Sequence, residues 1–80
     1  MMKAKVYVTL KNSIADPQGN AIRGALNKKG FSNVEDVRIG KLIEIELGDI
    51  TKEVAEKQLN EMCEKLLANT VIEKYEFEII

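Results

Sequence analysis

The stretch that decides the fold is residues 4–10, Ala-Lys-Val-Tyr-Val-Thr-Leu, which a short loop separates from Asp16-Pro17. Strict alternation of apolar and polar side chains over seven residues is the period of a half-buried β-strand. We expect its inward face to consist of Ala4, Val6, Val8 and Leu10.

A helix is predicted to begin directly after this loop. Asp16 can accept hydrogen bonds from the free N–H groups of a first turn, and Pro17 has the backbone angle that the first helical position needs. Gly30 suits the left-handed position that follows a helix. One face of this helix at 3.6-residue spacing carries Gln18, Ile22, Ala25, Leu26 and Lys29.

The remainder of the chain predicts a hairpin, a second helix and a last strand. Residues 34–47 form two strand-like runs that Gly40-Lys41 separates, which favours a hairpin turn at that dipeptide. Thr51 is the expected N-cap of a helix from about 52 to 68, and Asn69 is its expected left-handed stop. The predicted buried stripe of this helix is Ala55, Leu59, Met62, Cys63 and Leu66, and the last strand is built on Tyr75, Phe77 and Ile79.

The order β-α-β-β-α-β predicts one α+β domain over residues 1–80, a ferredoxin-like sandwich. Right-handed crossovers place both helices on one face of a four-stranded antiparallel sheet, in which the first strand lies between the last and the third. On the outer face, Lys3 and Lys5 should then face glutamates of both neighbours, namely Glu44, Glu46, Glu76 and Glu78. Such a charge-compensated face suits either water or a second sheet.

Composition excludes most function classes. The 80 residues carry 12 Lys and Arg against 13 Asp and Glu, a net charge of −1, which does not fit nucleic-acid binding. No apolar run approaches the length of a membrane span, and we expect no signal peptide and a cytoplasmic location. With no His and a single Cys, the chain lacks Cys–His catalysis and ordinary zinc sites. A non-catalytic domain is therefore expected, and its small core favours a dimer or a dimer of dimers.

Three features need more than a generic explanation. Cys63 lies on the buried stripe and is interpreted as a small core thiol. Gly19 stands in a helical first turn, where glycine costs about 1 kcal/mol relative to alanine. Gly24 lies in mid-helix, opposite the apolar stripe, and indicates either close approach of another chain or tolerated weakness.

The chain resembles the PurS family, the small subunits of phosphoribosylformylglycinamidine synthase. The resemblance covers essentially the whole chain in order. It departs at Thr70, where the family often has Pro, and at Ala15, where Leu is common. The matching pieces are Val8-Thr9-Leu10-Lys11, Asp16-Pro17-Gln18-Gly19, Ala25-Leu26, Gly30-Phe31, Val37-Arg38, Gly40-Lys41, the run from Met62 to Asn69, and Val71-Ile72-Glu73.

The resemblance implies a bridging subunit that joins a glutaminase subunit to an ATP-dependent synthetase subunit and assists ammonia transfer between them. It implies no catalytic residue and no cofactor in this chain, because ATP, Mg and glutamine are used by the partner subunits. No nucleic acid and no membrane is implied as a partner. The motif residues expected to act as contacts or scaffold are Asp16, Pro17, Gln18, Gly19, Gly24, Lys41 and Asn69.

One alternative class is a ligand-sensing regulatory domain of the ACT type, which also pairs ferredoxin-like units. Such domains usually bind an amino acid through a glycine-containing first loop. The corresponding loop here, residues 11–15, has no glycine. This absence weakens the alternative without removing it.

Overall fold

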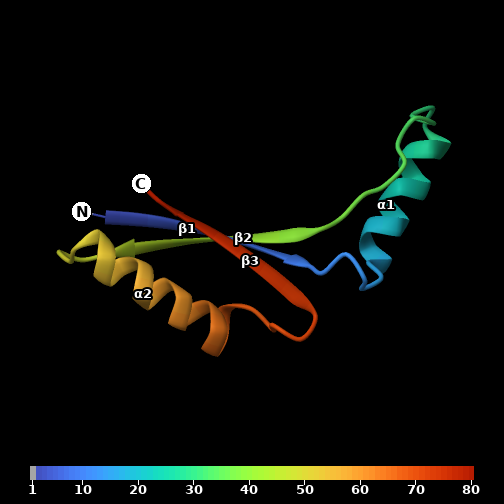
Figure 1. The fold of residues 1–80 in the computed structure, drawn as a ribbon. Coiled ribbons are helices and arrows are strands. Elements are labelled where there is room, and N and C mark those ends of the chain that lie inside the picture. Colours follow the sequence, from blue (N-terminus) through green and yellow to red (C-terminus); the bar gives the residue numbers. More distant parts are fainter. Residues whose placement is uncertain (1) are drawn as a thin grey trace.

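A computed structural model describes residues 2–80 and consists of a three-stranded sheet, two helices and a π-helical turn (Figure 1). The central strand β1 pairs antiparallel with both neighbours, in the order β2-β1-β3. The elements in chain order are β1 (Met2–Leu10), α1 (Pro17–Lys28), β2 (Gly40–Leu47), α2 (Lys52–Met62), η1 (Cys63–Leu67) and β3 (Glu73–Ile79).

The core lies between the sheet and α2, which runs across one sheet face (Figure 1). The predicted alternation of β1 is confirmed, because Ala4, Val6 and Val8 are almost fully buried. The helix contributes Ala55 and Leu59, followed by Cys63 at the start of η1, each without solvent exposure. Thr51 caps α2 as expected, since its Oγ1 accepts a hydrogen bond from the Val54 N–H at 3.2 Å.

The outer face of the sheet has the predicted charge pattern at Lys5, whereas Lys3 faces a glutamate on β2 only and Glu76 lies opposite Tyr7. Lys5 lies opposite Glu44 on β2 and opposite Glu78 on β3, and Lys3 lies opposite Glu46. The Tyr7 hydroxyl donates a hydrogen bond of 2.8 Å to Glu78, and this bond to a carboxylate raises the pKa of Tyr7. Charge compensation between neighbouring strands is the pattern that stabilises a solvated sheet face.

Residues 2–80 form a three-stranded sheet and not the predicted four-stranded one. Residues 33–39 form no strand, and the expected hairpin turn at Gly40-Lys41 is wrong. Instead, Gly40 pairs with Thr9 and Lys41 with Val8, as the first residues of β2. Because both residues pair with β1, they cannot form a hairpin turn. The segment that leads into β2 therefore comes from outside the sheet and is not an adjacent strand.

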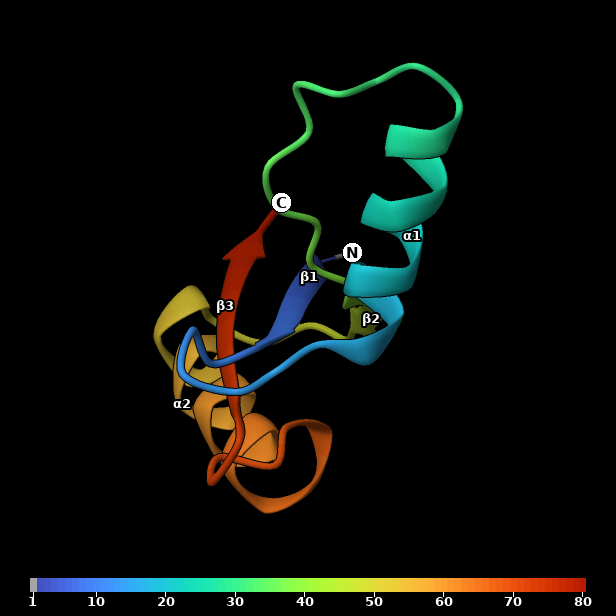
Figure 2. The same ribbon diagram turned by 90° about the vertical axis from the view of Figure 1, so that its right-hand side faces the viewer.

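The prediction that both helices cover the same sheet face is also wrong. Helix α1 stands beyond the end of the sheet, away from α2 (Figures 1 and 2). Its apolar stripe is largely exposed, with Ile22 at 41%. The radius of gyration is 16.2 Å, against about 12 Å for a compact domain of 80 residues. The helix therefore does not pack on the sheet of its own chain.

The end of α2 also departs from the predicted regular helix. The Ala68 N–H donates to the Cys63 carbonyl oxygen at 3.0 Å, a five-residue separation that makes η1 a π-helical turn. This wider turn rotates Leu66 off the buried stripe, so that it is 82% exposed.

Asn69 is not the left-handed stop that the pattern predicted. Within residues 2–80, the positive φ predicted at Gly30 is found, at 103°, and no other residue type has one.

No helix in residues 2–80 is both long enough and apolar enough to span a bilayer.

Replacing Cys63 with alanine should lower the free energy of unfolding by about 1 kcal/mol, because it removes a fully buried group from the core. Urea unfolding monitored by circular dichroism measures this loss. The core interpretation requires that the oligomer size stays unchanged. An unchanged unfolding midpoint would contradict it.

Candidate functional site

The residues singled out in the sequence gather where α1 and the segment after it leave the sheet. We call α1 together with residues 29–39 the arm. Asp16 lies at its base and is 4% exposed. Its Oδ1 accepts a hydrogen bond from the Gly19 N–H at 2.9 Å, as the predicted N-cap should, and its Oδ2 accepts one from the Ile39 N–H at 2.8 Å. One carboxylate therefore joins the start of the arm to its end.

The geometry accounts for the unexpected glycine in the first turn of α1. A Cβ added to Gly19 would overlap the carbonyl oxygen of Val37, so a side chain at this position would separate α1 from residues 37–39. Gly24 differs, because an added Cβ there would meet nothing within 4 Å. The structure thus explains Gly19 by contact inside the chain, while close approach of another chain at Gly24 stays a prediction.

Arg38 is a functional candidate that the sequence analysis named only as part of a matching dipeptide. Its Nη2 donates to the carbonyl oxygens of Lys11 and Ile14, at 2.9 and 2.8 Å. These two residues belong to the loop between β1 and α1, so Arg38 ties that loop to the returning segment. The signal available beforehand was a long charged side chain in a segment expected to be a strand.

Lys41 and Gln18 line a cavity of about 230 Å³ together with Asp16. Lys41 Nζ lies 3.8 Å from an oxygen of Glu73, also in the lining. The second Glu73 oxygen accepts a hydrogen bond of 2.7 Å from the Asn69 N–H. Asn69 is therefore joined to Lys41 through Glu73, which sequence reasoning had not singled out as a site residue.

The predicted residues divide clearly by position. The first turn of α1, with Pro17 as its first residue, shares the base of the arm with Lys41, and Asn69 reaches this region through Glu73. Gly24 lies apart, in the outer part of the arm. The candidate residues thus gather at a junction between elements.

The polar groups at this junction hold the backbone in a fixed geometry. The Ile39 and Gly19 N–H groups, in that order of effect, hold the pKa of Asp16 below its ordinary value, so the carboxylate is ionised and engaged at neutral pH. Burial raises the pKa of the Cys63 thiol, which disfavours the nucleophilic thiolate. No group of three potential metal-ligating side chains is present in the described part of the chain.

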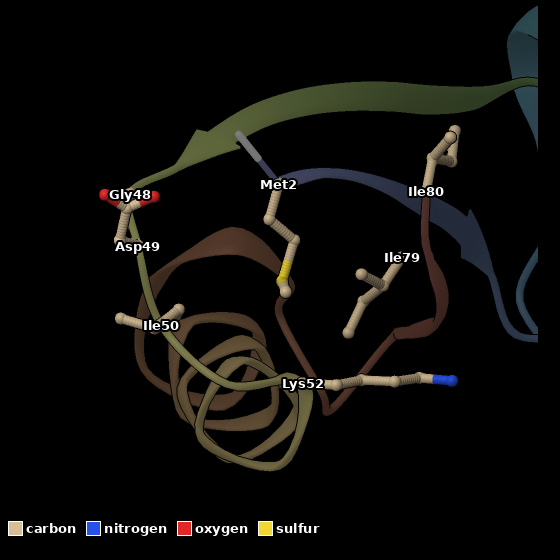
Figure 3. A pocket seen from close by; sticks show the side chains of 7 residues that line it. All are labelled: Met2, Gly48, Asp49, Ile50, Lys52, Ile79 and Ile80. Carbon is tan, nitrogen blue, oxygen red and sulfur yellow. The ribbon is translucent and has the colours of Figure 1, made fainter.

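A larger cavity, of about 410 Å³, lies at the opposite end of the sheet (Figure 3). Met2 from β1 and Ile79 from β3 extend toward the start of α2, where Ile50 and Lys52 complete much of the lining (Figure 3). Its lining combines aliphatic side chains with two charged ones. None of the residues predicted from the motifs belongs to it.

The comparisons with known proteins agree closely with one another. Residues 3–80 match the family described as PurS: Phosphoribosylformylglycinamidine (FGAM) synthase. The chain is 49% identical to the PurS subunit of this synthase from Bacillus subtilis, over 99% of this chain and 93% of the relative. It superposes on the crystal structure of Methanocaldococcus jannaschii PurS with a TM-score of 0.89 and 41% identity, covering 100% of this chain and 96% of the other.

A further solved structure is the PurLQS complex of Thermotoga maritima, in which one chain matches with a TM-score of 0.87 and 30% identity, covering 100% of this chain and 99% of that chain.

The fold and the site define a small α+β chain in which the motif residues join a protruding arm to a sheet. The family match names a subunit of a synthase and not a ligand-sensing domain. The chain belongs to the PurS family of phosphoribosylformylglycinamidine synthase subunits.

The depressed pKa of Asp16 predicts a specific pH dependence. A carboxyl group with a lower pKa in the folded state stabilises the fold above its unfolded pKa of 3.8, and this contribution is lost as the pH falls through the folded value. The stability difference between the wild type and Asp16→Asn should therefore shrink as the pH is lowered from about 5 to about 2. Urea unfolding at a series of pH values measures it, and a difference independent of pH would contradict the assignment.

Proposed function

We propose that this chain is the non-catalytic bridging subunit of a phosphoribosylformylglycinamidine synthase complex in purine biosynthesis. In this role it joins a glutaminase subunit to a synthetase subunit and assists ammonia transfer, so that formylglycinamide ribonucleotide is converted to its amidine. The observation that carries the proposal is the full-length family match, together with the likeness to a chain of the PurLQS complex. We place the complex in the cytoplasm.

The side chains support a geometric contribution. Glutamine hydrolysis needs an activated nucleophile, and the single thiol here is buried, with a raised pKa and no His in the sequence to activate it. Phosphoryl transfer needs positioned cations around a nucleotide. We therefore assign ATP, Mg and glutamine to the partner subunits, and no cofactor to this one.

We further propose that two copies form a homodimer by exchanging their arms. The chain enters β2 from outside the sheet, so the arm does not reach the outer edge of its own β2. That edge carries N–H and C=O groups that a further strand could pair with, and residues 34–39 were predicted to be this strand. Residues 34–39 of a second copy can supply it, which completes the four-stranded, ferredoxin-like sheet across two chains.

Apolar surfaces of matching kind are left open on the sheet and on the arm. Ile43 and Ile45 face inward beside Val6 and Ala4, yet both are only half-buried. The arm exposes Ile22 and, at 54%, Phe31. An exchanged α1 would cover the open part of the sheet face beside α2, where the regular fold places the first helix. Two such exchanges related by a two-fold axis form a closed dimer.

The surface area supports the same arrangement. The chain exposes 5933 Å², whereas a compact monomer of 9.0 kDa is expected to expose about 4,900 Å². The excess of about 1,000 Å² is close to the roughly 800 Å² per partner of a standard interface. The arm position also recurs among relatives, because a TM-score of 0.89 over 100% of the chain requires the arm to superpose along with the sheet.

Replacing Ile22 with glutamate should shift the dimer toward the 9.0 kDa monomer, because a charge would be buried against the partner's sheet. Val54→Glu is the matched control, since Val54 is also helical and is 43% exposed against 41% for Ile22. Light scattering at micromolar concentration measures the mass. A wild type that is already monomeric, or equal masses for both variants, would contradict arm exchange.

The bridging role predicts that glutamine-dependent amidine formation requires this chain. The glutaminase and synthetase subunits are mixed with and without it, and glutamine use and amidine product are followed. Holding two active sites together makes ammonia supply effectively intramolecular, so product per glutamine should fall sharply without it. Full turnover in its absence, or glutaminase or ATPase activity of the purified chain, would overturn the role.

A further inference from the structure

We propose that Asp16 and Gly19 act as a clasp that locks α1 and residues 37–39 into one rigid arm. The inference deepens the proposed function, since it rests on a dimer formed by arm exchange. In that dimer, α1 must pack on the partner's sheet while residues 34–39 of the same arm pair with the partner's β2. The clasp is the device that keeps their relative position.

Hydrogen bonding at the base must hold the arm, because the arm has little core of its own. Within α1 the one buried residue is Gly19, and Leu26 is half-buried. Away from the base, the side-chain link between α1 and the returning segment is a bond of 3.2 Å from Arg23 to the carbonyl oxygen of Glu35. Apolar burial inside the arm is therefore too small to align its two parts.

The clasp requires a carboxylate in particular. Oδ1 of Asp16 accepts from Gly19 and Oδ2 accepts from Ile39, so both oxygens are engaged by backbone donors. Asparagine has one acceptor oxygen, and its amide NH₂ would face the second donor. An asparagine can thus cap α1 but cannot also hold Ile39.

The clasp also joins the two connections between the arm and the sheet. Asp16 ends the loop that follows β1, and Ile39 directly precedes Gly40, the first residue of β2. Arg38 adds a second tie across the same place, through Lys11 and Ile14. With both connections tied together, α1 and residues 37–39 move as one body.

The test compares Asp16→Asn, Gly19→Ala and Gly24→Ala in the full chain. Hydrogen exchange followed by NMR reports the opening of the Ile39 and Gly19 amides. In Asp16→Asn, the Ile39 amide should exchange about tenfold faster or more, the effect of losing one charge-assisted hydrogen bond, while Gly19 changes less. Gly19→Ala should also expose Ile39, although alanine favours the helix.

Gly24→Ala is the matched control, because it makes the same substitution in the same helix with open space around the new Cβ. It should leave Ile39 exchange unchanged. Subunit exchange between isotope-labelled and unlabelled dimers, followed by native mass spectrometry, should be faster for the two clasp variants than for the wild type.

Unchanged Ile39 protection in both clasp variants would overturn the clasp, as would equal effects of Gly19→Ala and Gly24→Ala. If Asp16→Asn does not fold, the comparison of Gly19→Ala with Gly24→Ala still tests the clasp. A monomeric wild type with normal Ile39 protection would reject arm exchange, and the amide measurements would still decide the clasp.

Discussion

The pairing of Gly40 with Thr9 is the constraint on which the rest of the structure depends. A Cβ at Gly40 would lie 2.6 Å from the Thr9 methyl group and 2.8 Å from the Val8 carbonyl oxygen, so glycine permits this close approach. Once Gly40 belongs to the ladder, it is unavailable for a hairpin turn. The chain must then reach the sheet from outside, and everything between Leu10 and Gly40 projects beyond it.

Local patterns predicted the elements well where the signal lay within one element. The alternation of β1 and the caps at Asp16 and Thr51 are all found. The hairpin failed because a Gly-Lys pair between two apolar runs is compatible with either a turn or an uninterrupted strand. That choice depends on pairing with Thr9, some thirty residues earlier in the chain, which local periodicity does not contain.

In the candidate site, too, the sequence predicted the features that lie within one element and missed those that depend on tertiary contacts. The Asp16 to Gly19 motif could be singled out, because the glycine is costly where it stands. Its reason could not be predicted, since Val37 and Ile39 reach Gly19 and Asp16 only through the tertiary structure. Glu73 was missed for a related reason, because it joins Asn69 to Lys41 on β2 across the central strand β1.

The separation of arm and core has an energetic consequence. The largest fully buried side chain is Leu59, and the rest of the core is built chiefly from small residues such as Ala4, Ala55 and Cys63. A core of this size supplies only a few kcal/mol. Because further apolar surface lies on the arm and on the open half of the sheet, association would bury what folding leaves exposed. Stability and assembly are then coupled, which suits the proposed role of a chain that holds other subunits in register.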